Sequence, residues 1–150
     1  MQQGNGCGDI SFSTDVLETG LCEHFGRSVE ILDVQVRPRT ASSHPMAVLT
    51  VTLASGERLP VIFKRLHPGE QLYGNEVEVL IYRSVLKGER FGAPKLYASV
   101  YDAERGRYEL FLEHLGNSTL KDAAISSWIE APRWLARMHA TYFHREDELR

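Results

Sequence analysis

Apolar and polar side chains alternate along three consecutive segments in the first half of the chain. In an extended chain successive side chains point to opposite faces, so this pattern predicts three β-strands. The alternation of the first segment breaks at Leu32–Asp33, where we expect a bulge. A short "ASGE" sequence separates the second and third segments and predicts a hairpin. We expect an antiparallel meander of strands at residues 29–38, 46–53 and 58–66.

Two further strand-like segments, residues 95–102 and 107–115, are joined by "AERG", which predicts a second hairpin. Helical spacing of apolar residues appears instead in residues 13–26 and 75–89. Each of these two helices is expected to stop at a glycine, because glycine readily adopts the left-handed conformation that ends a helix. The order of elements is therefore helix, three strands, helix, two strands and helix.

The last helical segment, residues 119–146, contains Pro132. Proline is tolerated mainly in the first turn of a helix, so we expect two pieces, with the final helix starting close to Ala131. Leu135, Met138 and Tyr142 recur at helical spacing. They predict a buried stripe on this helix.

These elements predict an α+β fold, a five-stranded antiparallel sheet with one packed helix, followed by C-terminal helices. Residues 1–10 are rich in Gln, Gly and Asn, and we expect them to be disordered. Residues 11–115 would form the sheet-containing unit, and residues 116–150 a connection followed by helices. A chain of 150 residues suits one ordinary core.

Charge and composition exclude several classes of function. The net charge is -3 with acidic and basic residues interspersed, which argues against a nucleic-acid partner. No apolar run approaches the roughly 20 residues of a membrane span, so we expect no membrane partner. The N-terminus has no signal-peptide pattern and Cys7 and Cys22 have no metal-ligand spacing, which predicts a cytoplasmic protein without a metal site. A Cys7–Cys22 disulfide is the alternative for the cysteines.

The third predicted strand ends on a lysine. Alternation places Val61 and Phe63 on one face and Lys64 on the other, so an ammonium group faces a covered side of the sheet and needs an anion. Glu76 and Glu78 lie on the next helix, and only one of them can face the sheet because they are two residues apart. A helix packed through Ile81 and Val85 would direct Glu78 towards Lys64, whereas Glu76 stays possible. The ordinary alternative is a solvated lysine and two surface glutamates.

Five segments, in their order, resemble the N-terminal lobe of the aminoglycoside phosphotransferase and choline kinase family, which are small-molecule kinases with a protein-kinase-like fold. In such kinases a third-strand lysine contacts the nucleotide phosphates and pairs with a helix glutamate. The resemblance therefore implies an ATP-binding role for Lys64 and, by preference, Glu78. The segments are "LPVIFK", "NEVEVLIYRSVL", "FGAPKLYAS", "RYELFLEHLGNSTLKD" and "APRWLARMHATYF".

The resemblance also implies positions for the rest of the nucleotide. Glu113, His114 and Leu115 would form the hinge whose backbone binds the purine of ATP or GTP. Ser42 and Ser43 would lie in the loop over the phosphates, where hydroxyls and amides bind phosphate oxygens. The acceptor would be a small molecule with a hydroxyl group, and its identity is open.

In this family the catalytic base comes from a His-Gly-Asp loop with a downstream asparagine, and a later aspartate holds magnesium; the chain contains neither motif. We therefore assign no catalytic or metal-binding residue, expect a chain truncated before its catalytic loop, and expect it to be inactive alone. The alternative is a non-catalytic regulatory module that pairs with another kinase-like subunit through residues 119–143. An α+β domain with an accidental resemblance and an exposed Lys64 is the third interpretation.

Overall fold

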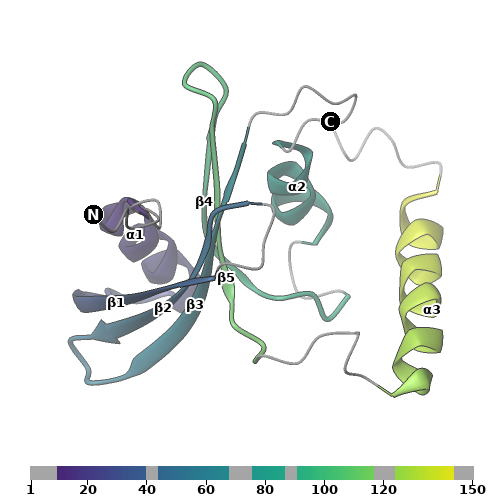
Figure 1. The fold of residues 1–150 in the computed structure, drawn as a ribbon, viewed down its shortest axis with the longest axis horizontal. Helices are drawn as coiled ribbons and strands as arrows, with labels where there is room; N and C mark the ends of the chain where they lie inside the picture. Colours follow the sequence, from purple (N-terminus) through teal and green to yellow (C-terminus); the bar gives the residue numbers. More distant parts are fainter. Residues whose placement is uncertain (1–9, 40–43, 68–75, 87–90, 117–123, 144–150) are drawn as a thin grey trace, which may run out of the picture.

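The computed structural model shows a five-stranded sheet with helices on both sides (Figure 1). In Figure 1, α1 lies on one face of the sheet, and α2 and α3 lie on the other side. The structure describes residues 10–39, 44–67, 76–86, 91–116 and 124–143.

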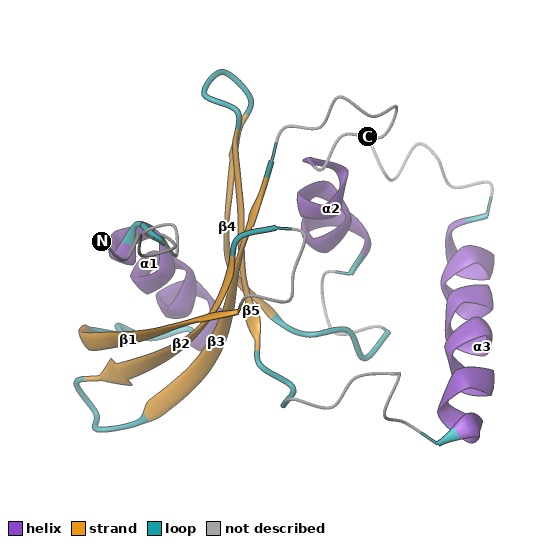
Figure 2. Cartoon of the chain, in the orientation of Figure 1, coloured by secondary structure: helices purple, strands orange, loops and turns teal. Residues whose placement is uncertain are grey.

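The sheet is fully antiparallel, with strand order β1-β2-β3-β5-β4 (Figure 2). The predicted α+β class and five-stranded antiparallel sheet are confirmed. The expected bulge is present as a register shift between Ile31 and Asp33, and a second shift lies between Leu96 and Ala98. The strands are β1 (Ile31–Arg39), β2 (Met46–Leu53), β3 (Arg58–Leu66), β4 (Leu96–Asp102) and β5 (Arg107–Glu113).

Helix α1, Thr14–Phe25, covers one face of the sheet. Ser13 occupies the N-cap position without a side-chain capping hydrogen bond, and Gly26 ends the helix in the left-handed region with φ 62°. Leu17 and Leu21 are fully buried and join the inward residues of the strands. The core on this face also contains Leu49, Val51, Val61, Phe63 and Phe111.

The sequence analysis assigned one helix to the sheet, but α1 packs on it as well as α2. Gly20 allows this packing, because α1 passes very close to β4 at this residue. A Cβ atom at Gly20 would lie 2.6 Å from the Ala98 Cβ and even closer to the Tyr97 carbonyl oxygen. Any larger side chain at residue 20 would therefore separate the helix from the strand.

The opposite face carries the helical segment expected at residues 75–89, in a shorter form. Helix α2 spans Glu76–Leu80, and a π-helical turn, η1, follows at Ile81–Val85. The expected contact through Ile81 is wrong, because Ile81 is exposed whereas Val79 is fully buried and Tyr82 packs beside it. The π-turn rotates the later residues relative to a regular helix. The second core contains Leu66, Val79, Tyr108, Leu110 and Leu112.

Two expectations about the last helix are wrong. Helix α3 is one continuous helix, Ile125–Tyr142, with Pro132 inside it, so the predicted break near Ala131 is wrong. Proline removes one backbone hydrogen bond, but those of the neighbouring turns hold the helix together. The predicted buried stripe is also wrong, since α3 has no buried residue. It contacts the described chain through Trp134 Nε1, which donates to the Phe91 carbonyl, and the Tyr142 hydroxyl, which donates to the Val85 carbonyl at 2.6 Å.

A buried carboxylate joins β3 to β5 on the α1 face. Glu109 is completely buried. Its Oε1 accepts hydrogen bonds from Arg65 Nε at 3.0 Å and Nη2 at 2.8 Å, and its Oε2 accepts one from Arg107 Nη2 at 2.8 Å. This bond to Glu109 raises the pKa of the Arg107 guanidinium. Arg65 also donates to the Ser11 carbonyl and thereby connects the segment before α1 to the sheet.

Replacing Gly20 by alanine should destabilise the fold, although alanine is favoured over glycine by about 1 kcal/mol in a helix interior. The added methyl group meets β4, and overpacking of this kind costs about 1–3 kcal/mol. Urea unfolding of the Gly20→Ala protein measures the change. The exposed neighbour Thr19 supplies the control, because Thr19→Ala keeps the contact with β4 and should not destabilise. A more stable Gly20→Ala protein would show that the helix and strand are not in close contact.

Replacing Glu109 by alanine should lower the free energy of unfolding by about 1–3 kcal/mol, because two partly exposed arginines lose their charged hydrogen-bond partner. The matched control is Glu57→Ala, which removes the half-exposed ion pair between Arg27 Nη2 and Glu57 Oε2 at 3.8 Å. An exposed pair contributes about 0–1 kcal/mol. Chemical denaturation of both variants compares the two effects, and equal losses would contradict the buried role of Glu109.

Candidate functional site

The candidate site is centred on Lys64, near the end of β3. Val61 and Phe63 are fully buried on the α1 face. Alternation therefore turns Ile62 and Lys64 towards α2. Because α2 covers this face, the lysine side chain is only 20% exposed.

Lys64 is paired with Glu78 of α2. Lys64 Nζ donates to Glu78 Oε1 at 2.8 Å and to Oε2 at 2.6 Å. The glutamate side chain is 36% exposed, so the pair is partly open to solvent. Glu76 opens α2, and its side chain lies outside the described part of the structure. The contact therefore joins the central strand of the sheet to the helix that follows it.

The Lys64 ammonium group retains the capacity to bind a second anion. An ammonium group has three N–H donors, and the two oxygens of Glu78 account for two acceptors. Within the described residues, no other acceptor contacts Lys64. Since both groups remain partly exposed, an anionic oxygen can approach the third donor from solvent.

Apolar side chains surround the ion pair on the same face of the sheet. Residues opposite one another on neighbouring strands share a face. Lys64 lies between Met46 of β2 and Leu110 of β5 in the strand register. In the next row the three central residues, Val48, Ile62 and Leu112, are apolar. The α2 face thus places a cation beside an apolar surface.

A second cation shares this row, and the sequence analysis missed it. Arg39 of β1 is opposite Met46, which is opposite Lys64, so the arginine and the lysine face the same side two strands apart. Two strand spacings amount to about 10 Å. Arg37 occupies the equivalent position opposite Val48. The signal was the alternation of arginines in "QVRPR", but only the strand register shows that they share the lysine face.

Tyr82 lies one turn after Glu78 and connects the ion pair to the core of this face. Burial raises the pKa of the Tyr82 phenol, and the negative charge of Glu78 raises it further. The phenol therefore remains protonated at neutral pH. Tyr82 packs against the apolar cluster formed by β3, β5 and α2.

The three predicted hinge residues lie at the end of β5, where Glu113 is the last strand residue and His114 and Leu115 follow it. The Glu113 amide donates to the Lys95 carbonyl at 2.8 Å, and Glu113 Oε2 accepts from the Lys95 amide at 3.2 Å. Glu113 is therefore engaged with the start of β4. The His114 Nε2 atom is shielded from solvent and has no hydrogen-bond partner among the described residues, and Leu115 is exposed.

Some predicted site features lie beyond what the structure shows. Ser42 and Ser43 fall outside the described residues. Across the described ranges, no group of three His, Cys, Asp or Glu side chains is placed to hold a metal ion. In the same ranges no helix has the length and apolar character needed to cross a membrane.

Cys22 is a free thiol whose Sγ accepts from the Val29 amide at 3.2 Å.

A cavity lies elsewhere, at the outer edge of β4. Its volume is about 780 Å³, and it is lined by α1, η1 and the segment Ala93–Ser99. The residues that line it do not include Lys64, Glu78 or the predicted hinge residues. The ion pair and this cavity are thus separate features, and only the ion pair has the charged groups that the sequence singled out.

Comparisons of the chain with protein-family models, with curated proteins and with solved structures yield no match. The function has to be inferred from the site geometry.

Proposed function

We propose that this chain is the nucleotide-binding lobe of a small-molecule phosphotransferase and binds ATP on the α2 face of the sheet. The observation that carries the proposal is the contact of Lys64 Nζ with both carboxylate oxygens of Glu78. A lysine of the third strand paired with a glutamate of the next helix is the arrangement by which kinases place a cation on nucleotide phosphates.

The residues around the Lys64–Glu78 pair offer contacts for the phosphates and for the purine of ATP. The free donor of Lys64 would contact a phosphate oxygen, with the ammonium group held in place by Glu78. The apolar row of Val48, Ile62 and Leu112 would cover one face of the purine. The backbone of His114 and Leu115 would hydrogen-bond its edge, which favours a purine nucleotide, ATP or GTP.

The proposal stops at nucleotide binding. Transfer of a phosphoryl group also requires a bound magnesium ion and an oriented acceptor hydroxyl. The described residues offer no three-ligand metal cluster, and we assign neither a magnesium ligand nor a catalytic base to them. A small hydroxyl compound is the acceptor class that the proposal implies, and the cytoplasm, where ATP is abundant, is the compartment it assigns.

Replacing Lys64 by methionine should weaken ATP binding about 10- to 100-fold, because a hydrogen bond to a charged group contributes about 1.5–3 kcal/mol. Glu78→Gln should weaken it less, since the ammonium group remains but loses its charged partner. Titration of each protein with ATP by NMR measures affinities even in the millimolar range.

The matched control for Lys64 is Arg58→Met. Arg58 is on the same strand and face, and six residues of extended chain place it about 20 Å away. Its ATP affinity should equal that of the wild-type chain. Wild-type affinity in the Lys64→Met protein, with the fold intact by circular dichroism, would overturn the proposal.

Replacing Arg39 by glutamine should weaken ATP binding about 3- to 10-fold while leaving adenosine binding unchanged, because Arg39 shares the row of Lys64 and would act on the phosphates alone. The ATP effect should shrink at high salt, where charge interactions are screened. Arg105→Gln in the β4–β5 turn removes the same charge far from the site and controls for net charge. An equal loss for ATP and adenosine would mean that Arg39 acts through the fold.

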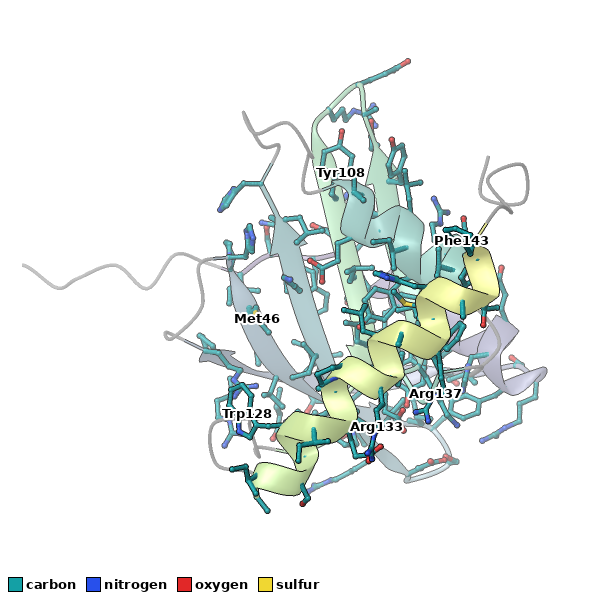
Figure 3. The ribbon with its side chains drawn as sticks, turned by 90° about the vertical axis from the view of Figure 1, so that its right-hand side faces the viewer. Met46, Tyr108, Trp128, Arg133, Arg137 and Phe143 are labelled. Atoms are coloured by element: carbon teal, nitrogen blue, oxygen red, sulfur yellow. The ribbon has the colours of Figure 1, made fainter. Side chains whose placement is uncertain are left out.

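A second candidate function is a non-catalytic module that pairs with another kinase-like subunit. Helix α3 favours it, because Ile125 is 81% exposed and Trp128 and Ile129 are about half exposed. Figure 3 shows α3 crossing in front of the sheet, with Trp128, Arg133 and Arg137 along it. This candidate needs no nucleotide, so it is the one that remains if the wild-type chain does not bind ATP.

A further inference from the structure

The cavity at the outer edge of β4, which we call the edge groove, has the form of a trough with two different walls. Helix α1 forms one wall and η1 the other, and β4 with the segment before it forms the floor. The α1 wall runs from Asp15 to His24, which is about 14 Å of helix. The residues on the walls are Asp15, Val16, Thr19, Gly20, Glu23 and His24 of α1, and Tyr82, Arg83 and Leu86 of η1 and its end.

The floor of the edge groove is the outer edge of β4, where α1 lies against the Tyr97 carbonyl at Gly20. Strand β4 is last in the sheet order and pairs only with β5 among the described strands. An edge strand presents backbone N–H and C=O groups that another extended chain can bind. The flanking helices recess this edge, so a single extended segment fits between them better than a whole sheet does. An extended segment of about four or five residues matches the length of the α1 wall.

The two walls carry opposite charges. Asp15 and Glu23 lie on the α1 wall and Arg83 lies on the η1 wall. Within the described residues none of these three side chains forms an ion pair. The η1 wall also carries Tyr82 and Leu86. A strand lying in the groove turns alternate side chains to opposite walls, so it would place basic residues towards α1 and apolar or acidic residues towards η1.

A second copy of the chain does not satisfy these charges. Antiparallel pairing of β4 with its own copy requires a two-fold axis normal to the sheet, which keeps α1 of both copies on the same side. Asp15 and Glu23 would then face their own counterparts across the axis. Like charges disfavour that pairing, whereas a partner strand with basic residues relieves them.

We propose that the edge groove binds an extended segment of a partner protein, which adds a sixth strand beside β4. The segment has two basic side chains four positions apart, about 13 Å in an extended chain, which matches the roughly 12 Å of helix between Asp15 and Glu23. The side chains that point to the other wall are apolar or acidic and are directed to Tyr82 and Arg83. Backbone hydrogen bonds to β4 supply affinity, and the two charged walls select the sequence.

Selection of a random hexapeptide library on the folded chain tests this proposal. Enriched peptides should carry Lys or Arg at two positions four residues apart, and N-methylation of alternate amides should abolish their binding. Hydrogen exchange at Leu96–Asp102 should slow when the peptide is bound. No enrichment, enrichment without this spacing, or binding that survives N-methylation on both sets of amides would overturn the proposal.

Charge reversal on the α1 wall provides a second test of the proposal. Asp15→Lys together with Glu23→Lys should weaken the selected peptide at least tenfold, measured by fluorescence anisotropy. The same peptide with its basic residues exchanged for Glu should bind the reversed protein, which shows that the variant is folded. The control pair Glu30→Lys and Glu104→Lys makes the same change in net charge outside the groove and should bind the original peptide within twofold of wild type. Unchanged binding by the Asp15 and Glu23 variant, or failure of the exchanged peptide, would overturn the charge assignment.

Discussion

The contact between Lys64 and Glu78 links the sheet to the helix that covers one of its faces. Its lysine belongs to the central strand β3, and its glutamate belongs to the short helix that covers one face of the sheet. A partly buried ammonium group requires an anion, and Glu78 provides both of its oxygens. The position of α2 on the sheet and the direction of the lysine are therefore set together, and any ligand that uses Lys64 depends on both.

The charged side chains on the two faces of the sheet are compensated to different extents. On the α1 face Glu109 is completely buried and is bound by two arginines, so its charge is compensated within the fold. On the α2 face the Lys64–Glu78 pair is partly exposed and keeps an unused donor. Complete compensation suits a structural role, whereas incomplete compensation beside an apolar row leaves interaction capacity for a ligand.

Helix η1 brings the ion pair and the edge groove close to one another. Tyr82 lies one turn after Glu78, and it also lines the groove at β4. A segment bound in the groove would contact η1, which continues directly from the helix α2 that holds Glu78. The proposed nucleotide site and the proposed partner site nevertheless use different residues, so each is open to separate substitution.

The sequence by itself determined the type and order of the elements, because alternation and helical spacing are local properties. It also singled out Lys64 as a lysine on a covered strand and narrowed its partner to two glutamates. Only the tertiary structure decided that Glu78 reaches Lys64, that Arg39 shares its row and that α1 lies against β4 at Gly20. These facts depend on strand register and on the approach of distant segments. The uninterrupted α3 likewise depended on the whole helix, since the local effect of Pro132 predicted a break.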